Sequence, residues 1–485
     1  MEDYAAEGRS LARVDGKVIF IEGAVPGDVV DIQVSKSKKD WAEGRASRFY
    51  SYSQDRVVPF CSHFGVCGGC QWQMLPYEKQ LEYKQRQVKD SLQRIGKVAL
   101  PGIMPILGAS KTKHYRNKIE YTFGTKEFTI EKPSKKSHTD TKGDCKLSES
   151  SQVPPREGFR GAGFHAKGFF DKIVDIDTCY LQEEPTNAIR LAVKEFARVH
   201  DYSFYDIREH KGFLRTMQLR ICTTGEVMVN IVFGEDDKNK RENLLDHMLK
   251  QFPSITTLLY TINTKKNDSL HDLEPVAYFG KGYVIEKLSA GPGEEDFQFK
   301  IGPKSFFQTN TYQGEQLYRI TRDFAELTGK EIVYDLYCGT GSIGIFVSKK
   351  AKKIIGVEMI AAAIDDAREN AAMNNLTGAG FYAGDVIDIC NDEFFAMHGR
   401  PDVIITDPPR AGMHEKLVKK IIDIEAPTVV YVSCNPATQA RDLNWLDEKY
   451  AITKIQPVDM FPHTLHIENV VQLKLRAEGE KETKS

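Results

Sequence analysis

The chain has 485 residues, and its 66 lysines and arginines nearly balance its 68 aspartates and glutamates. A chain of this length exceeds what one hydrophobic core usually serves, so we expect two or three domains. The near-neutral charge does not by itself indicate a nucleic-acid-binding protein. No stretch approaches the roughly 20 consecutive apolar residues of a membrane span, and the first residues lack the features of a signal peptide. We therefore expect a cytoplasmic protein without membrane association.

The first 52 residues are predicted to form a small all-β domain. Short β-type runs occur at residues 18–21 and 29–34, and the turn-forming sequence PGD separates them at residues 26–28. The stretches GRSLARVDGK (residues 8–17) and GAVPGD (residues 23–28) resemble the TRAM domain, an OB-like β-barrel. That resemblance implies an RNA-binding module.

The nine cysteines argue for reduced thiols or metal ligands, because an odd count without a secretory signal does not suggest a disulfide framework. Three of them, Cys61, Cys67 and Cys70, lie within ten residues of each other and supply soft ligands at close spacing. The other six are scattered singly: Cys145, Cys179, Cys222, Cys338, Cys390 and Cys434. The close group and Cys434 need separate explanations.

Residues 53–300 are predicted to form a mixed α/β central domain. An amphipathic helix is expected over residues 77–95, directly after the three cysteines, and strand-like segments occur at 216–233 and 257–264. The segment 126–160 is polar, rich in Lys, Ser, Thr and Pro, and lacks apolar periodicity, so it is expected to be a mobile insertion.

Residues 301–478 are predicted to form a doubly wound, mostly parallel α/β domain. A helix is expected near residues 312–327. Short apolar strands separated by helix-length segments follow it at residues 332–336, 353–357, 403–406 and 429–432.

A nucleoside pocket is predicted at the ends of the first two of these strands. The sequence DLYCGTGSIG at residues 335–344 is a glycine-rich turn that opens a helix and lets the backbone approach a ligand closely. The next strand ends in Glu358, whose carboxylate can accept hydrogen bonds from ribose hydroxyls. A dinucleotide enzyme would show the same two features. The later sequences GD at 384–385 and DPPR at 407–410 complete an ordered series that resembles class I S-adenosylmethionine methyltransferases, and Asp385 falls where the adenine is usually contacted.

Four short sequences resemble the RNA uracil-5-methyltransferases: SFFQTN (305–310), DPPR (407–410), VSCNPAT (432–438) and HTLHIENV (463–470). The resemblance implies a Rossmann-like class I methyltransferase domain. It assigns cofactor binding to Gln308, Tyr337, Glu358 and Asp407, and it makes Cys434 the nucleophile and Glu468 the base.

The chemistry explains the need for a thiol. Carbon 5 of uracil is too weak a nucleophile to attack a methyl sulfonium unaided, but addition of a thiolate at carbon 6 makes it an enolate. A base must then remove the proton from carbon 5 so that the thiol can leave. Phe306 and Phe307 are candidates either for stacking on a flipped-out base or for core packing, and Cys338 is expected only to pack.

The resemblance also implies that Cys179 is the fourth ligand, beside Cys61, Cys67 and Cys70, of a four-iron, four-sulfur cluster. Structural zinc is the main alternative, because it uses the same number of ligands. The β-barrel combined with a cysteine group is more similar to 23S ribosomal RNA enzymes than to the transfer-RNA enzyme, so we expect 5-methyluridine formation in ribosomal RNA by a monomer.

Three alternatives stay open at this point. The first is a transfer-RNA uracil-5-methyltransferase. The second is a noncatalytic RNA-binding protein with a decayed methyltransferase domain, against which the intact Cys434, Glu468 and Gln308 argue. The third is methylation at carbon 5 of cytosine, which shares the thiol chemistry but generally carries a different set of motifs.

Overall fold

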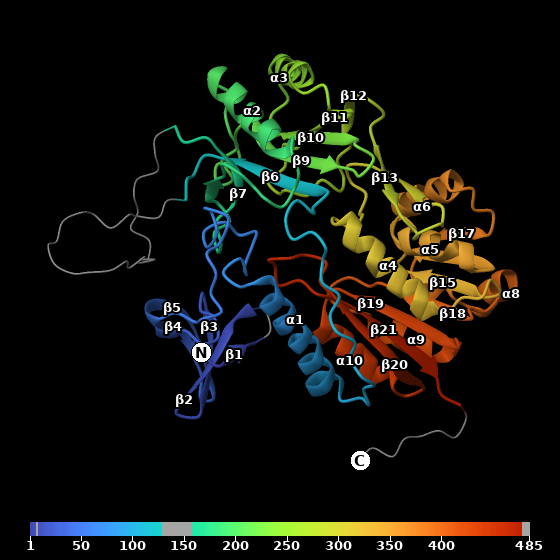
Figure 1. Ribbon diagram of the computed structural model, residues 1–485. Helices are drawn as coiled ribbons and strands as arrows, with labels where there is room; N and C mark the ends of the chain where they lie inside the picture. The colour runs from blue at the N-terminus through green and yellow to red at the C-terminus, as the bar shows by residue number, and fades with distance from the viewer. Residues whose placement is uncertain (6–7, 129–157, 478–485) are drawn as a thin grey trace.

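The computed structural model describes residues 1–5, 8–128 and 158–477. Each of three larger β-sheets is built from one stretch of the chain, and the stretches follow one another from the N-terminus to the C-terminus (Figure 1). Within the described ranges, no helix combines the length and the apolar character needed to span a bilayer.

The N-terminal sheet has five strands in the order β1-β2-β3-β5-β4 and includes a parallel pair, β3 with β5. Its strands are β1 (Asp3–Tyr4), β2 (Ser10–Val14), β3 (Lys17–Glu22), β4 (Val29–Ser37) and β5 (Trp41–Ser51). Their inward residues, among them Ala12, Ile21 and Ala46, form a small separate core. The predicted N-terminal β domain is confirmed.

The cysteine-containing loop leads into α1 (Tyr77–Ser91), which ends in a π-helical turn, η2 (Leu92–Gly96). Although α1 precedes the central sheet in the chain, its apolar side packs on the C-terminal domain. Val88 and Leu92 are fully buried in the same core as Leu443 and Ile455. In Figure 1, α1 accordingly lies beside the red C-terminal elements.

The central sheet has seven strands in the order β12-β11-β10-β9-β6-β7-β8. Its strands are β6 (Lys118–Gly124), β7 (Gly161–His165), β8 (Ile173–Asp175), β9 (Leu214–Ile221), β10 (Val227–Phe233), β11 (Thr257–Ile262) and β12 (Val276–Phe279). The helices α2 (Thr186–Val199) and α3 (Lys238–Gln251) bury their apolar faces on it. The predicted mixed α/β character is confirmed. Most of the expected insertion, residues 129–157, lies outside the described residues; its two ends join the neighbouring strands β6 and β7.

A two-stranded hairpin, β13 (Val284–Leu288) and β14 (Phe297–Ile301), connects the central and C-terminal sheets. Its inward residues Val284 and Phe299 share a core with Leu317 of α4 (Thr311–Ala325) and with Val430 of the C-terminal sheet. The hairpin therefore packs with the C-terminal domain, although it precedes residue 301.

The C-terminal sheet has seven strands in the order β17-β16-β15-β18-β19-β21-β20, and of these only β21 runs against its neighbours. Its strands are β15 (Ile332–Leu336), β16 (Lys353–Glu358), β17 (Ala379–Ala383), β18 (Val403–Thr406), β19 (Thr428–Ser433), β20 (Tyr450–Val458) and β21 (Glu468–Leu475). Its further helices are α5 (Ser342–Val347), the 3-10 turn η3 (Ser348–Lys350), α6 (Ala361–Met373), α7 (Val386–Ile389), α8 (Asp392–His398), α9 (Glu415–Ile424) and α10 (Pro436–Leu446).

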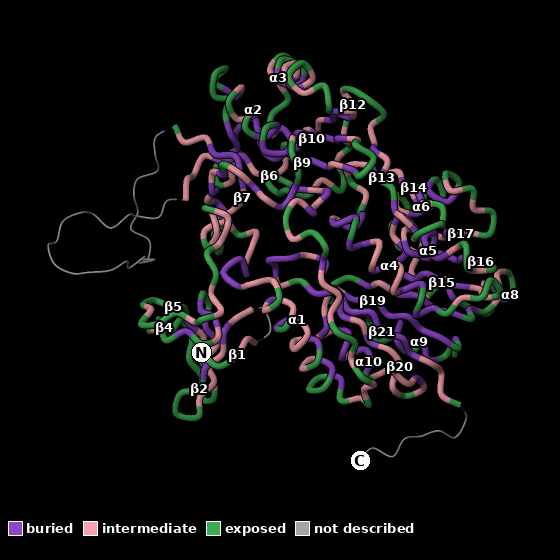
Figure 2. The backbone as a smooth tube through the Cα atoms, in the orientation of Figure 1, coloured by how far each residue is buried: buried purple, intermediate pink, exposed green. Residues whose placement is uncertain are grey.

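Figure 2 shows that the strands of this sheet are largely buried, as expected when helices cover both faces. The predicted Rossmann-like doubly wound domain is confirmed. The strand order reverses between β15 and β18, and in such sheets ligands bind at the carboxyl ends of the strands beside this switch point. Because β21 is antiparallel, its first residue lies at that same edge.

Candidate active site and cysteine cavity

The glycine-rich turn after β15 adopts a left-handed conformation at three positions. Tyr337, Gly339 and Gly341 have φ values of +61°, +52° and +77°. A Cβ on Gly341 would lie 2.9 Å from the Phe381 ring and 3.1 Å from Ala367, so both the conformation and the space require glycine there. The turn therefore exposes main-chain groups where a nucleoside can approach.

Glu358 reaches this turn from the end of β16. Its carboxylate accepts hydrogen bonds from the main-chain nitrogens of Gly339, at 3.3 Å, and Ile360, at 3.0 Å. The side chain is half-buried, so its outer face can receive the hydroxyls of a ribose. Asp385, after β17, caps α7 by accepting a hydrogen bond from Ile387 N at 2.8 Å.

Gln308 is buried just before α4, and a neighbour from the central domain holds its backbone. Asn117 Nδ2 donates to the Gln308 carbonyl and to Thr311 Oγ1, both at 2.9 Å, while Asn117 N donates to the Thr309 carbonyl at 2.8 Å. Sequence reasoning missed Asn117, because nothing in its local sequence marks it. Its role depends on β6 lying against the segment that precedes α4.

The strand register brings Cys434 and Glu468 together. Ser433 of β19 pairs with Asn469 of β21 and ends this ladder, so Cys434 follows and Glu468 precedes the last pair. The charge of Glu468 accordingly acts on the Cys434 thiol. Asp407 follows Thr406, the last residue of the neighbouring strand β18. The three predicted chemical groups, on strands separated in the sequence, thus converge at one edge of the sheet.

Electrostatics at this edge favour protonated groups. Burial raises the pKa of Glu468 well above its ordinary value, and the nearby Asp407 carboxylate adds to the shift. Desolvation also raises the pKa of Asp407 to about 7. For Cys434, burial raises the thiol pKa to about 12, with smaller contributions from Glu468 and Asp407. Arg410 opposes the shifts of Cys434 and Glu468, and although it lies in the DPPR sequence, no role was predicted for it.

The two phenylalanines before Gln308 have different environments. Phe307 is 3% exposed and packs against Phe299, with ring centroids 5.5 Å apart, so it belongs to the core. Phe306 is 71% exposed.

Cys338, inside the glycine-rich turn, is buried, and burial raises the pKa of its thiol well above the ordinary value.

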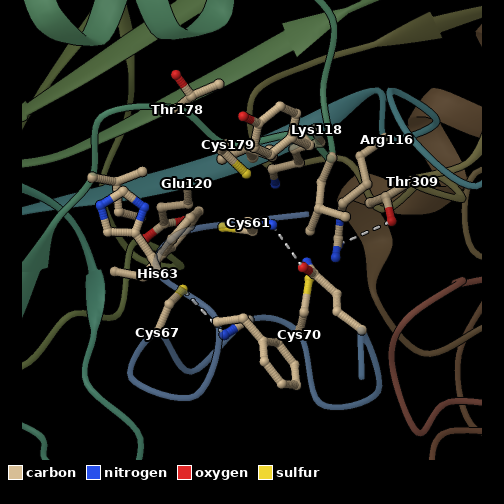
Figure 3. A pocket seen from close by; sticks show the side chains of 18 residues that line it. Cys61, His63, Cys67, Cys70, Arg116, Lys118, Glu120, Thr178, Cys179 and Thr309 are labelled. Carbon is tan, nitrogen blue, oxygen red and sulfur yellow. Dashed lines mark hydrogen bonds between the residues drawn. The ribbon is translucent and has the colours of Figure 1, made fainter. Parts of the chain in front are cut away.

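Four cysteines from two distant parts of the chain line one cavity of about 300 Å³. Figure 3 shows Cys61, Cys67 and Cys70 on the loop before α1, and Cys179 entering from the central domain. A bridge between Cys67 and Ala166 holds the loop against the central domain.

The wall of this cavity carries both signs of charge, because the carboxylate of Glu120 lines it together with basic side chains. Gly69 N donates a hydrogen bond to Cys67 Sγ at 3.4 Å. Arg116 and Lys118 also line the cavity, and the charge of Arg116 opposes the burial that raises the pKa of Cys70 and of Cys179. Across the described ranges, however, no three His, Cys, Asp or Glu side chains are placed to bind one metal ion.

The sheet order, the left-handed glycine turn and the acidic residue at the end of the second parallel strand define the class I S-adenosylmethionine-dependent methyltransferases. Family models agree with this class: residues 273–476 match the tRNA (uracil-5-)-methyltransferase model and residues 2–46 match the TRAM domain.

Relatives match nearly the whole chain. A protein of Bacteroides thetaiotaomicron named an uncharacterized RNA methyltransferase is 49% identical, over 97% of this chain and 100% of its own length. One of Porphyromonas gingivalis with the same name is 48% identical, over 97% and 98%. The crystal structure of Pyrococcus abyssi tRNA (uracil-54, C5)-methyltransferase with S-adenosyl-L-homocysteine matches with a TM-score of 0.72 and 30% identity, over 97% and 98%. The chain therefore belongs to the RNA uracil-5-methyltransferase family.

Proposed function

We propose that this protein forms 5-methyluridine in RNA through a covalent bond between Cys434 and carbon 6 of the target uracil. The observation that carries the proposal is the β19–β21 register, whose last pair, Ser433 with Asn469, brings Cys434 near Glu468 and Asp407. A nucleophile and a base at one sheet edge, next to a nucleoside-binding turn, are what this reaction requires.

The residues divide the reaction between them. Burial favours the neutral thiol of Cys434, so the thiol must lose its proton to solvent as substrate binds, and Arg410 is the neighbouring charge that favours the resulting thiolate. Attack at carbon 6 moves the double-bond electrons to carbon 5. S-adenosylmethionine, when bound, supplies the methyl group that carbon 5 takes up. Because its raised pKa favours the protonated carboxyl, Glu468 must first lose its own proton to solvent. The carboxylate then accepts the carbon 5 proton, the double bond re-forms, and Cys434 leaves as the thiolate.

The predicted cofactor residues surround the same edge. Glu358 beside Gly339 is assigned to the ribose hydroxyls and Asp385 to the adenine. Gln308, Tyr337 and Asp407 complete the proposed cofactor set. The exposed ring of Phe306 is assigned to stacking on the target base, which must leave its helix to be reached, whereas Phe307 is excluded from this role by its burial.

We propose a four-iron, four-sulfur cluster for the cysteine cavity. Such a cluster carries one thiolate on each of four irons, so its ligands lie farther apart than those of a single zinc ion, which sit about 2.3 Å from one centre. What supports the cluster is that four cysteines, the number of ligands it needs, line one cavity. Cys61, Cys67, Cys70 and Cys179 would hold it.

For the RNA, we propose 23S ribosomal RNA, on the combination of the TRAM domain with the cysteine cavity. Transfer RNA is the second candidate, because the Pyrococcus abyssi enzyme, whose description names tRNA uracil 54, matches 97% of the chain. Labelled methyl transfer to separate 23S ribosomal RNA and transfer-RNA transcripts, with nucleoside digestion, distinguishes the two. Label in 5-methylcytidine would contradict the uracil assignment itself.

The covalent mechanism is tested with two variants. Cys434→Ala is expected to form no protein–RNA adduct, while Glu468→Gln still adds to the uracil and transfers methyl but cannot eliminate. A methylated adduct that survives denaturing electrophoresis should therefore accumulate only with Glu468→Gln. RNA with 5-fluorouridine at the target should trap the unaltered protein in the same way. Turnover by Cys434→Ala at the normal rate would exclude the mechanism, and RNA binding without turnover by the unaltered protein would favour the noncatalytic alternative.

A further inference from the structure

Three polar residues of α1 face a single segment of the C-terminal domain. Tyr77, Gln80 and Lys84 are spaced three and four residues apart, which places them on one side of the helix. They contact the segment 459–466, which follows β20 and ends two residues before Glu468, the first residue of β21.

The first contact is an ion pair inside the protein. Lys84 Nζ lies 2.6 Å from Asp459 Oδ1, and both side chains are 0% exposed. Lys84 Nζ also donates to the Phe461 carbonyl at 3.2 Å, and Tyr77 donates its hydroxyl to Asp459 Oδ2 at 2.8 Å. Asp459 follows Val458, which pairs directly with Glu468 in the β20–β21 register. The Lys84–Asp459 ion pair therefore holds the chain at the residue next to Val458, the strand partner of the proposed base Glu468.

The second contact fixes the middle of the segment. Gln80 Oε1 accepts a hydrogen bond from His463 N at 2.9 Å, and Gln80 Nε2 contacts His463 Nδ1 at 3.1 Å. His463 has a φ of +66°, a left-handed conformation that is uncommon outside glycine. Its carbonyl accepts from the main-chain nitrogens of Gln71 and Trp72, so the cysteine-containing loop holds the same point.

Stability alone does not account for this arrangement. Taking two charges out of water costs several kcal/mol each, and apolar side chains of similar volume often serve as well or better. The apolar side of α1, with Val88 and Leu92, already attaches the helix to the C-terminal domain. The polar side of α1 instead fixes the position of the segment 459–466, and therefore the position of the start of β21.

We propose that Tyr77, Gln80 and Lys84 are positioning residues, which hold the 459–466 segment so that Glu468 reaches the proton on carbon 5. This inference rests on the proposed role of Glu468. It predicts an effect on one step: elimination slows, whereas addition of Cys434 and methyl transfer, which do not need Glu468, proceed.

The test follows both steps in a single turnover with end-labelled RNA. The double variant Lys84→Met/Asp459→Asn removes both charges together and so leaves no unpaired ion in the core. Lys89→Met, on an exposed position of the same helix, is the matched control, and Tyr77→Phe, which removes one hydroxyl, is a milder second variant. Thermal unfolding of each variant identifies any that does not fold.

In the double variant, resolution of the methylated adduct should slow roughly 10- to 100-fold, the size expected for a misplacement of about 1 Å. Adduct formation, and the KM for RNA and for S-adenosylmethionine, should change no more than in Lys89→Met. Tyr77→Phe should slow resolution in the same direction by a smaller factor. A merely structural role would instead lower the fraction of active protein and leave both rate constants unchanged, which would overturn the inference.

Glu468→Gln is measured in parallel to separate the two hypotheses. If it accumulates adduct while the double variant and Tyr77→Phe resolve theirs at the normal rate, the positioning role is excluded and the proposed function stands. If Glu468→Gln itself accumulates none, the assignment of the base fails, and the positioning role fails with it.

Discussion

At the scale of single residues, Glu358 is where cofactor binding can be tested apart from catalysis. Its carboxylate lies beside the glycine-rich turn and is not part of the core, so Glu358→Ala should fold normally. A lost hydrogen bond to a charged group should weaken S-adenosylhomocysteine binding about 10- to 100-fold. Calorimetric titration measures this, with Glu369→Ala on the outer face of α6 as the control; equal affinities would refute the ribose assignment.

The thiol of Cys434 gives a second prediction, about pH. Because burial raises its pKa to about 12, alkylation of Cys434 by iodoacetamide should rise about tenfold per pH unit between pH 7 and 10. Arg410 lowers this pKa, so Arg410→Gln should raise it and slow alkylation at any given pH. Mass spectrometry of the Cys434 peptide follows the rate. Arg400 is an exposed arginine paired with Asp392, so Arg400→Gln should leave the alkylation rate of Cys434 unchanged. Faster alkylation of Cys434 in Arg410→Gln would contradict the proposed effect of Arg410 on the thiol pKa.

At the scale of elements, one glutamate links α4 to the last two strands. Glu326, at the left-handed end of α4, lies 2.6 Å from Lys454 of β20 and 2.7 Å from Lys474 of β21. Hydrogen bonds from these lysines lower its pKa to about 2. The ion pairs thus stabilise the fold fully above the unfolded pKa, and the contribution is lost as pH falls through the folded value.

Glu326→Gln should therefore destabilise the protein by about 0.5 to 1 kcal/mol at pH 7, a small amount because the side chain is 43% exposed. The difference should shrink as pH falls from about 4.5 toward 2. Urea unfolding of both proteins at pH 7 and pH 3 measures it. A difference that grows on acidification would have the wrong sign for this interaction.

At the scale of the whole molecule, the cysteine cavity joins the loop before α1 to the central domain. Protein purified without oxygen should be brown and contain about four iron and four sulfide per chain. Cys179→Ala should release the metal and loosen this connection, whereas Cys390→Ala, in the core of the C-terminal domain, should retain it. Elemental analysis identifies the bound metal, and stoichiometric zinc in place of iron would favour a structural zinc site with the same four cysteine ligands.

The sequence by itself determined the parts of this protein that depend on neighbouring residues. The apolar runs of β15, β16, β18 and β19 identified the parallel sheet, because strands covered on both faces read as continuous apolar segments. The glycine turn and the acidic residue at the end of β16 identified the edge of the sheet where a cofactor can bind, since parallel strands place their carboxyl ends together.

Only the tertiary structure decided which distant segments meet. The reversal of β21 brings Glu468 close to Cys434, because Ser433 pairs with Asn469, a residue more than thirty positions away in the sequence. From the local sequence, Lys84 is only one position of an amphipathic helix. Its buried partner Asp459 lies 375 residues away, so the ion pair could not be predicted. Asn117 beside Gln308 had no local signal either. Periodicity reports which side of an element is buried; which group it meets there depends on the packing of the whole chain.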